Sequence, residues 1–231
     1  MAMSRQSKDN LIRNAFFFTA LSSIVALALI MLYLFIEGLP IFQVVSVTDF
    51  LFGHYWYPTS EPHEFGIFPL IVASLAVTAL SSAIAIPLGV MTAIYLAEIA
   101  SRRTRDMFKP VVELLAALPS VVIGFFGMVV VAPYIQETFG LATGLNLFNA
   151  AIMLAFMSVP TICSVSEDAI YAVPRELKEA SLALGATHFE TIAKVVLPAS
   201  LSGISTAVML GMSRAIGETM VVLMVAGGAA M

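Results

Sequence analysis

Charged residues are scarce in this chain, and their scarcity excludes an ordinary soluble protein. Asp, Glu, Lys and Arg together make up 11% of the 231 residues, whereas 60% of the residues are hydrophobic and the mean hydropathy is +0.97. A typical soluble domain is about one quarter charged. The chain is therefore expected to be a membrane protein, whose length is best counted in helical spans of about 20 residues.

Cysteine is nearly absent, and so are the usual signs of a catalytic or metal centre. The single thiol, Cys163, lies in an apolar run, where a buried and unreactive side chain is expected. His54, His63 and His188 are too far apart in the sequence to suggest a metal site. No Gly-x-x-x-x-Gly-Lys-Ser/Thr sequence is present, so ATP binding is not expected. We predict no catalytic residue, metal, cofactor or nucleic-acid partner.

Apolar runs long enough to cross a bilayer dominate what is present. They lie near residues 15–36, 67–96, 111–131, 147–169 and 200–225. The first run follows Arg5, Lys8 and Arg13 but is too long for a secretory signal, so we interpret it as a retained anchor. The sequence predicts an all-α, polytopic transmembrane helical bundle of five spans, with residues 1–231 forming a single transmembrane domain.

The distribution of basic residues predicts the orientation of these spans. Lys and Arg are missing from residues 37–66 and 132–146, whereas they occur before the first run and within residues 98–110 and 170–198. Cytoplasmic loops of membrane proteins carry the excess of basic residues. The amino terminus and the two basic loops are therefore expected to be cytoplasmic. The aromatic segment 50–65 would then lie outside, as an interfacial collar or, less simply, as a contact for substrate or a partner.

The second run carries a stripe of small residues, which predicts close packing against another helix. The stripe recurs every four residues as Ser81, Ala85, Gly89, Ala93 and Ala97. Prolines at positions 87, 119 and 160 also lie within the runs. Inside a bilayer such prolines either kink a helix or shape a cavity, and both interpretations stay open.

The cytoplasmic segment 171–198 has the local signals of two short helices. Pro174 predicts the start of the first helix and Gly185 its end. Thr187 and Glu190 have the spacing of a capping box, which predicts a second helix that Pro198 would close. Two short helices at a sharp angle would form a compact projection on the cytoplasmic face.

This segment resembles the EAA loop of ATP-binding-cassette (ABC) importer permeases. The resemblance rests on Glu179-Ala-Ser, on Gly185 and on Val195-Val-Leu-Pro198, with Ser181 and Val195 as mild departures. It implies a type I importer fold in which residues 171–198 couple the permease to a dimer of ABC ATPase subunits. The implied coupling residues are Glu179, Ala180, Gly185, Leu197 and Pro198. The chain would then be a transport permease and not an enzyme, because the partner subunits hydrolyse ATP.

A second resemblance, to phosphate-specific importer permeases and in particular the PstC-type subunit, narrows the substrate. It rests mainly on Arg214-Ala-Ile-Gly-Glu-Thr-Met220, and also on residues 49–58 and 118–127. It implies a bacterial inner-membrane subunit that carries inorganic phosphate by alternating access. The implied partners include a PstA-type permease, a periplasmic phosphate-binding protein and membrane lipid. Family members usually have six spans, so a sixth span is expected to be missing from this sequence.

Other functions stay open at this point. The sister PstA-type subunit shares the Arg-Ala-x-Gly-Glu-Thr pattern, and a permease for sulfate or molybdate would also need a cation in its pathway. A secondary transporter or channel is more remote, because we find no inverted repeats with paired broken helices.

Arg214 lies inside the fifth apolar run, where an arginine costs about 2.5 to 3.5 kcal/mol and usually faces a partner or a water-filled cavity. Glu218, four residues later, is expected to pair with it. A guanidinium offers planar paired donors that match phosphate oxygens. Arg214, Glu218 and Thr219 are therefore predicted to line the substrate pathway, with a purely structural ion pair as the alternative.

Three further acidic residues lie near the cytoplasmic ends of spans. They are Glu113, Glu167 and Asp168. Because proton-relay acids usually lie deeper in the membrane, we expect these residues to pair with the basic cluster between positions 102 and 109.

Overall fold

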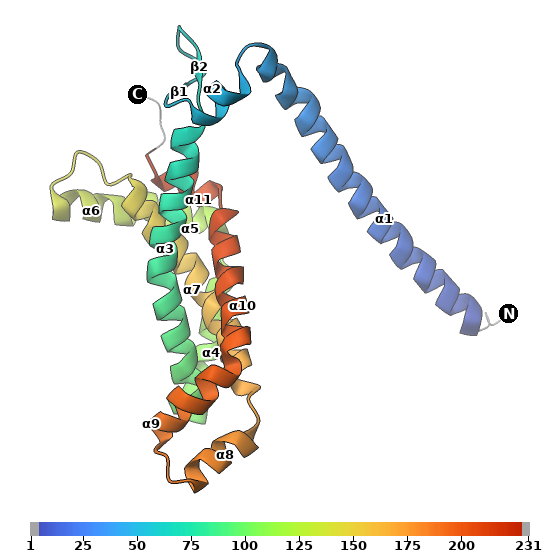
Figure 1. Cartoon of the computed structure of the whole chain (residues 1–231), viewed down its shortest axis with the longest axis vertical. Helices are drawn as coiled ribbons and strands as arrows, with labels where there is room; N and C mark the ends of the chain where they lie inside the picture. Colours follow the sequence, from blue (N-terminus) through green and yellow to red (C-terminus); the bar gives the residue numbers. More distant parts are fainter. Residues whose placement is uncertain (1–4, 228–231) are drawn as a thin grey trace. The chain divides into compact units, whose positions relative to one another are not determined.

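The computed structural model describes residues 5–227, which fall into two compact units divided between Leu70 and Ile71 (Figure 1). The first unit contains α1 (Arg5–Gly38), η1 (Leu39–Gln43), α2 (Val47–Phe52), β1 (Trp56–Tyr57) and β2 (Glu64–Phe65). Ser46 caps α2 by accepting a hydrogen bond from the amide of Asp49 at 3.1 Å. The two strands pair antiparallel, with Trp56 opposite Phe65. The aromatic segment therefore forms a small hairpin rather than an irregular loop.

The second unit is entirely helical. Its elements are α3 (Phe68–Ile94, which begins at the boundary), η2 (Tyr95–Ile99), α4 (Arg102–Ala116), α5 (Ser120–Phe126), η3 (Gly127–Val131), α6 (Ala132–Phe139), α7 (Leu147–Tyr171), α8 (Arg175–Ala183), α9 (His188–Thr191), η4 (Ile192–Val196), α10 (Leu197–Ile216) and α11 (Met220–Val225). Of these, η2, η3 and η4 are π-helical turns. The fold class predicted from composition is confirmed.

The centre of this unit is α7, which packs against α4, α5, α10 and α11. Glycines let two neighbouring helices approach it closely at one residue, Ile162. A Cβ atom added at Gly89 of α3 would lie 2.8 Å from the Cβ of Ile162, and one added at Gly211 of α10 would lie 2.4 Å from its Cγ1. The small-residue stripe on α3 is confirmed as a packing surface, because Ser81, Ala85, Gly89 and Ala93 are all buried.

Among the described residues, five helical segments are long and apolar enough to cross a membrane, as predicted. They are Asp9–Gln43, Phe68–Ile99, Ser120–Phe139, Leu147–Tyr171 and His188–Ile216. The bounds of two of them differ from those of the predicted runs, in each case near a proline or a glycine. The predicted third span, 111–131, is interrupted: residues 111–116 end α4, and Pro119 stands at the N-cap of α5. Proline disfavours helix in the residue before it, so Pro119 starts a helix instead of kinking one.

The predicted end of a short helix at Pro198 is wrong. The helix continues from α9 through η4 into α10, and Pro198 lies in the first turn of α10. Proline has no amide hydrogen for the hydrogen bond to the residue four positions earlier. The π turn just before it changes the bonding pattern, since the amide of Leu197 bonds to the carbonyl of Ile192, five residues back. The predicted fifth span also ends early, at Ile216, and α11 follows as a separate helix.

We predict that Gly211→Ala destabilises the bundle by about 1 to 3 kcal/mol, because the new methyl group overlaps Ile162 in a packed core. Unfolding in mixed detergent and dodecyl sulfate measures this change. Gly38→Ala is the matched control, since nothing lies within 4 Å of its added Cβ. Combining Gly211→Ala with Ile162→Ala should lower stability by less than the sum of the two single changes. Additive effects would contradict the contact.

Candidate functional site

The segment between α7 and α10 forms the projection that the sequence predicts. Pro174 stands at the N-cap of α8, and Gly185 follows the helix with φ of +86°. Glycine adopts this left-handed conformation without steric penalty, and it commonly ends helices in this way. The predicted first helix of the loop and its glycine end are confirmed.

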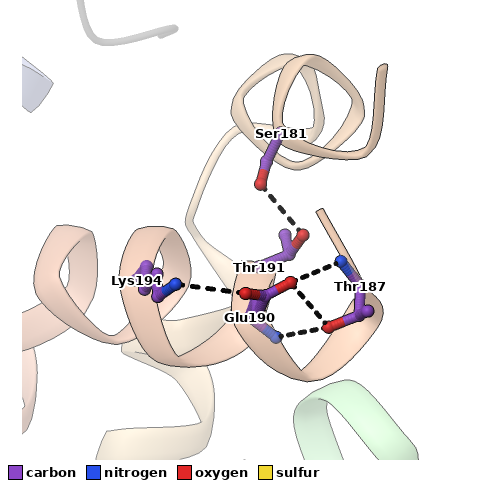
Figure 2. Close-up of polar contacts among 5 residues, drawn as sticks. All are labelled: Ser181, Thr187, Glu190, Thr191 and Lys194. Carbon is purple, nitrogen blue, oxygen red and sulfur yellow. Dashed lines mark hydrogen bonds and ion pairs between the residues drawn. The ribbon is translucent and has the colours of Figure 1, made fainter. Parts of the chain in front are cut away.

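Figure 2 shows the polar contacts that hold the second helix. The amide of Glu190 donates to the hydroxyl of Thr187 at 3.3 Å, and the Thr187 amide donates to the Glu190 carboxylate at 3.0 Å. This is the predicted capping box. Lys194 donates to the same carboxylate at 3.1 Å. Ser181 of α8 contacts the hydroxyl of Thr191 in α9 at 3.0 Å, so the two helices are joined by a side-chain hydrogen bond.

The outer surface of this projection carries apolar side chains in solvent. Leu184 is 89% exposed and Phe189 is 77% exposed. Glu179 and Ala180 are exposed as well. Large apolar side chains that are this exposed on a projection from the bundle indicate a surface for a protein partner.

The five predicted coupling residues therefore fall into two groups. The structure places Glu179, Ala180 and Gly185 in or directly after α8, on the projection. Leu197 and Pro198 instead begin α10, beyond the projection.

The inner side of α8 carries an ion pair that sequence reasoning missed. Lys178 donates to the carboxylate of Glu98, a residue 80 positions earlier at the end of η2. A pocket of about 370 Å³ adjoins the pair, lined by Ala97, Tyr171, Val173, Arg175, Lys178 and Glu179. No local pattern links positions 98 and 178, so only the fold could reveal this contact.

A second ionic cluster joins α4 to the end of α7. The side chain of Glu167 is 1% exposed and pairs with Arg105 at 2.7 Å and with Lys109 at 3.1 Å. Lys109 also pairs with Asp168 at 2.9 Å. This hydrogen bond to Asp168 raises the pKa of Lys109 above its ordinary value of 10.5, so the ammonium is charged at neutral pH. The predicted pairing is thus confirmed for Glu167 and Asp168, whereas Glu113 is exposed and has no ion pair with a described residue.

Arg214 lies in the last turn of α10 and is half-buried. Its guanidinium donates to the hydroxyl of Thr161 in α7 at 3.3 Å and to the carbonyl of Ala116, the last residue of α4, at 3.1 Å. The carboxyl ends of helices favour cations, and both α4 and α10 end here. Arg214 therefore connects three helices and has only neutral oxygens as its hydrogen-bond partners among the described residues.

The expected ion pair between Arg214 and Glu218 is not formed in the described structure. The expectation assumed one helix through both residues, but α10 ends at Ile216. The Glu218 carboxylate instead accepts from the amide of Val221 at 3.2 Å, in the first turn of α11. Thr219, the third predicted pathway residue, is exposed at the N-cap of α11. The structure thus brings the three residues to one helix junction without joining them.

Residues 85–231 match the family described as binding-protein-dependent transport system inner membrane component. The chain belongs to this family. It is 44% identical over 210 residues to a probable ABC transporter permease protein, YqgH, of Bacillus subtilis, covering 90% of this chain and 68% of the relative. It is 36% identical over 200 residues to a phosphate transport system permease protein PstC of Mesorhizobium japonicum, covering 78% and 61%.

The fold is also similar to that of a solved importer. An inward-facing structure of the MetNI methionine ABC transporter matches with a TM-score of 0.57 and 25% identity, covering 69% of this chain and 74% of that chain. The family and this match identify the chain as an inner-membrane component with the type I ABC permease fold. The chain spans about 61% to 68% of the length of the two curated relatives given above.

We predict that Glu167→Gln lowers the free energy of unfolding by about 1 to 3 kcal/mol. This loss of stability is smaller than for a fully buried ion pair, because the side chains of Arg105 and Lys109 are 23% and 30% exposed and can be hydrated. Glu113→Gln is the control, as an exposed carboxylate in the same part of the fold. Unfolding in mixed detergent measures both variants. Equal stability of Glu167→Gln and the wild type would contradict the role of the cluster in holding α4 on α7.

Proposed function

We propose that this chain is the PstC-type permease subunit of an ATP-driven importer of inorganic phosphate. The observation that carries the proposal is the position of Arg214, which is half-buried where α4, α7 and α10 meet. The PstC proteins of Mesorhizobium japonicum and Pasteurella multocida, 36% and 35% identical to this chain, support the choice of phosphate. The motif Arg214-Ala-Ile-Gly-Glu-Thr lies within the region that matches the family model.

The contacts of Arg214 suit a transient anion site. Its two hydrogen-bond acceptors, the Thr161 hydroxyl and the Ala116 carbonyl, are neutral. A phosphate oxygen is a stronger partner for a guanidinium than either of them, because charge-assisted bonds are roughly twice as strong as neutral ones. The arginine can therefore exchange these oxygens for phosphate without first breaking an ion pair. On this proposal the empty pathway keeps Arg214 on neutral partners, and Glu218 stays at the start of α11.

Glu218 and Thr219 give the same junction a means of recognising phosphate. Phosphate at neutral pH carries hydroxyl hydrogens and can donate to a carboxylate, whereas sulfate cannot. The Glu218 carboxylate and the exposed Thr219 hydroxyl both lie within five residues of Arg214 in the chain. A carboxylate that accepts a hydrogen bond from the substrate argues against the alternative of a permease for sulfate or molybdate. The PstA-type role is opposed instead by the PstC names of the relatives.

In this proposal, the projection formed by α8 and α9 is the part of the permease that the ATPase moves. We assign Glu179, Ala180 and Gly185 to the surface that docks on an ABC ATPase dimer, with residues 171–198 as the coupling loop. Because α9, η4 and α10 form one continuous helix, movement of the loop is delivered directly to the helix that bears Arg214. Leu197 and Pro198 act within this connection. ATP hydrolysis belongs to the partner subunits.

The remaining parts of the importer follow from this role. A PstA-type permease would complete the pathway, and a periplasmic phosphate-binding protein would deliver the anion in an alternating-access cycle. The amino terminus would face the cytoplasm, in agreement with the distribution of basic residues. Membrane lipid would cover the apolar surface of α1, in which the exposed side chains include Phe16, Ile24 and Leu32.

Uptake of labelled phosphate by the complex reconstituted in liposomes tests the proposal. We expect uptake that requires ATP and that a large excess of sulfate does not inhibit. Uptake without ATP, or equal transport of sulfate, would reject an ATP-driven phosphate permease.

Arg214→Gln is expected to reduce phosphate uptake at least roughly thirtyfold, which corresponds to the loss of about 2 kcal/mol of interaction between a half-buried guanidinium and phosphate. Assembly with the ATPase should be unchanged, because Arg214 lies at the opposite end of the His188–Ile216 helix from the projection. Arg103→Gln, at an exposed arginine of α4, is the control. If the Arg214→Gln variant retains phosphate uptake, Arg214 has only a structural role.

A further inference from the structure

Helix α8 has two faces with different partners. The exposed face carries Glu179 and Ala180. Lys178 and Ser181, one helical turn apart, are both partly buried. They point inward and contact other helices of this chain. The outer face is thus available to a partner, while the inner face attaches α8 to the membrane helices.

The two inner residues reach different helices. Ser181 contacts Thr191 of α9, which is continuous with α10. Lys178 reaches Glu98 in η2, which continues α3 within the Phe68–Ile99 segment. Helices α3 and α10 are the two that contact Ile162 of α7 through Gly89 and Gly211. One face of α8 is therefore connected to both of the helices that pack on α7 at this residue.

The contact with α3 is difficult to break. The side chain of Glu98 is 8% exposed, and its ion-pair partner among the described residues is Lys178. Separating α8 from η2 would leave a nearly buried carboxylate without its countercharge, which is strongly unfavourable. The connection to α10 is covalent, whereas the ion pair is the polar connection between α8 and the α3 segment. Val173, just before α8, adds apolar packing, since it shares one cluster with Ala93 and Leu96.

We propose that the Lys178–Glu98 ion pair transmits displacement of α8 to α3, so that α3 and α10 move together against α7. Lys178 and Glu98 are positioning residues for transport, and neither touches the substrate. The inference rests on the docking of α8 on the ATPase that is proposed above. It adds that one docking movement drives two membrane helices by separate routes.

The test uses the assembled permease and ATPase complex with Cys163→Ser and one new thiol at the η2 end of the α3 segment, Ile99→Cys, at a side chain that is 59% exposed. The rate at which this thiol reacts with a maleimide is measured with and without ATP. In Lys178→Gln and Glu98→Gln, we expect the ATP-dependent change in rate to fall about fivefold or more, a typical size for a lost coupling. ATPase association and hydrolysis should persist, because the outer face of α8 is intact.

The charge exchange Lys178→Glu with Glu98→Lys is expected to restore the change in rate. Lys194→Gln, which breaks an exposed pair in the same loop, should leave it at the wild-type value. A full ATP-dependent change in either single variant would overturn the proposal, and so would an assembled exchange variant that shows no recovery. Loss of assembly in the single variants and in the exchange variant would give the pair a purely structural role, which also overturns it.

These measurements do not depend on the identity of the cargo. A wild-type complex that does not carry phosphate would reject the function proposed above, while the thiol rates would still report whether α3 follows α8.

Discussion

The continuity of the helix from His188 to Ile216 is the constraint on which the rest of this structure depends. The helix survives a proline at position 198 because the π turn at Ile192–Val196 changes the hydrogen-bonding pattern just before it. At 1.5 Å per residue, its 29 residues extend for about 40 Å, which is the scale of the bilayer. The capping box at Thr187 fixes one end, and Arg214 lies in the last turn at the other. On the proposed function, the loop that docks on the ATPase and the arginine that binds phosphate thus belong to one continuous helix.

Helix α7 provides the surface against which this element can move. Ile162 lies against glycines on both α3 and α10, so the neighbouring backbones approach α7 closely. At its cytoplasmic end, α7 is tied to α4 through the buried carboxylate of Glu167. The ion pairs therefore tie α4 to α7 and α8 to the end of the α3 segment, while α3 also packs on α7 through Gly89. Arg214 adds a third polar connection, since α10 carries it and α4 and α7 supply its partners.

Features encoded by neighbouring residues could be predicted from the sequence. The apolar runs and the small-residue stripe depend on composition and period alone. The capping box at Thr187 and the turn at Gly185 require only a few adjacent residues. All of these features are present in the structure, although two of the five apolar runs have other bounds there.

The errors lie where packing decides the backbone. The i,i+4 rule predicted an Arg214–Glu218 pair, but the helix ends between the two residues. Pro198 is a helix breaker by local rules, yet the π turn before it accommodates it. The partners of Arg214 lie 53 and 98 positions away, and Glu98, the partner of Lys178, lies 80 positions away. No sequence pattern operates over such separations.

Distance measurement between spin labels on the long helix tests its rigidity most directly. In a Cys163→Ser background, labels at His188→Cys and Met209→Cys lie on either side of the π turn, both at exposed positions. A second pair, Met209→Cys with Phe156→Cys, joins α10 to α7. In the assembled complex, ATP should leave the first distance unchanged and shift the second. A change in the first distance, with the second constant, would show that the helix bends at the π turn and that the loop does not drive Arg214.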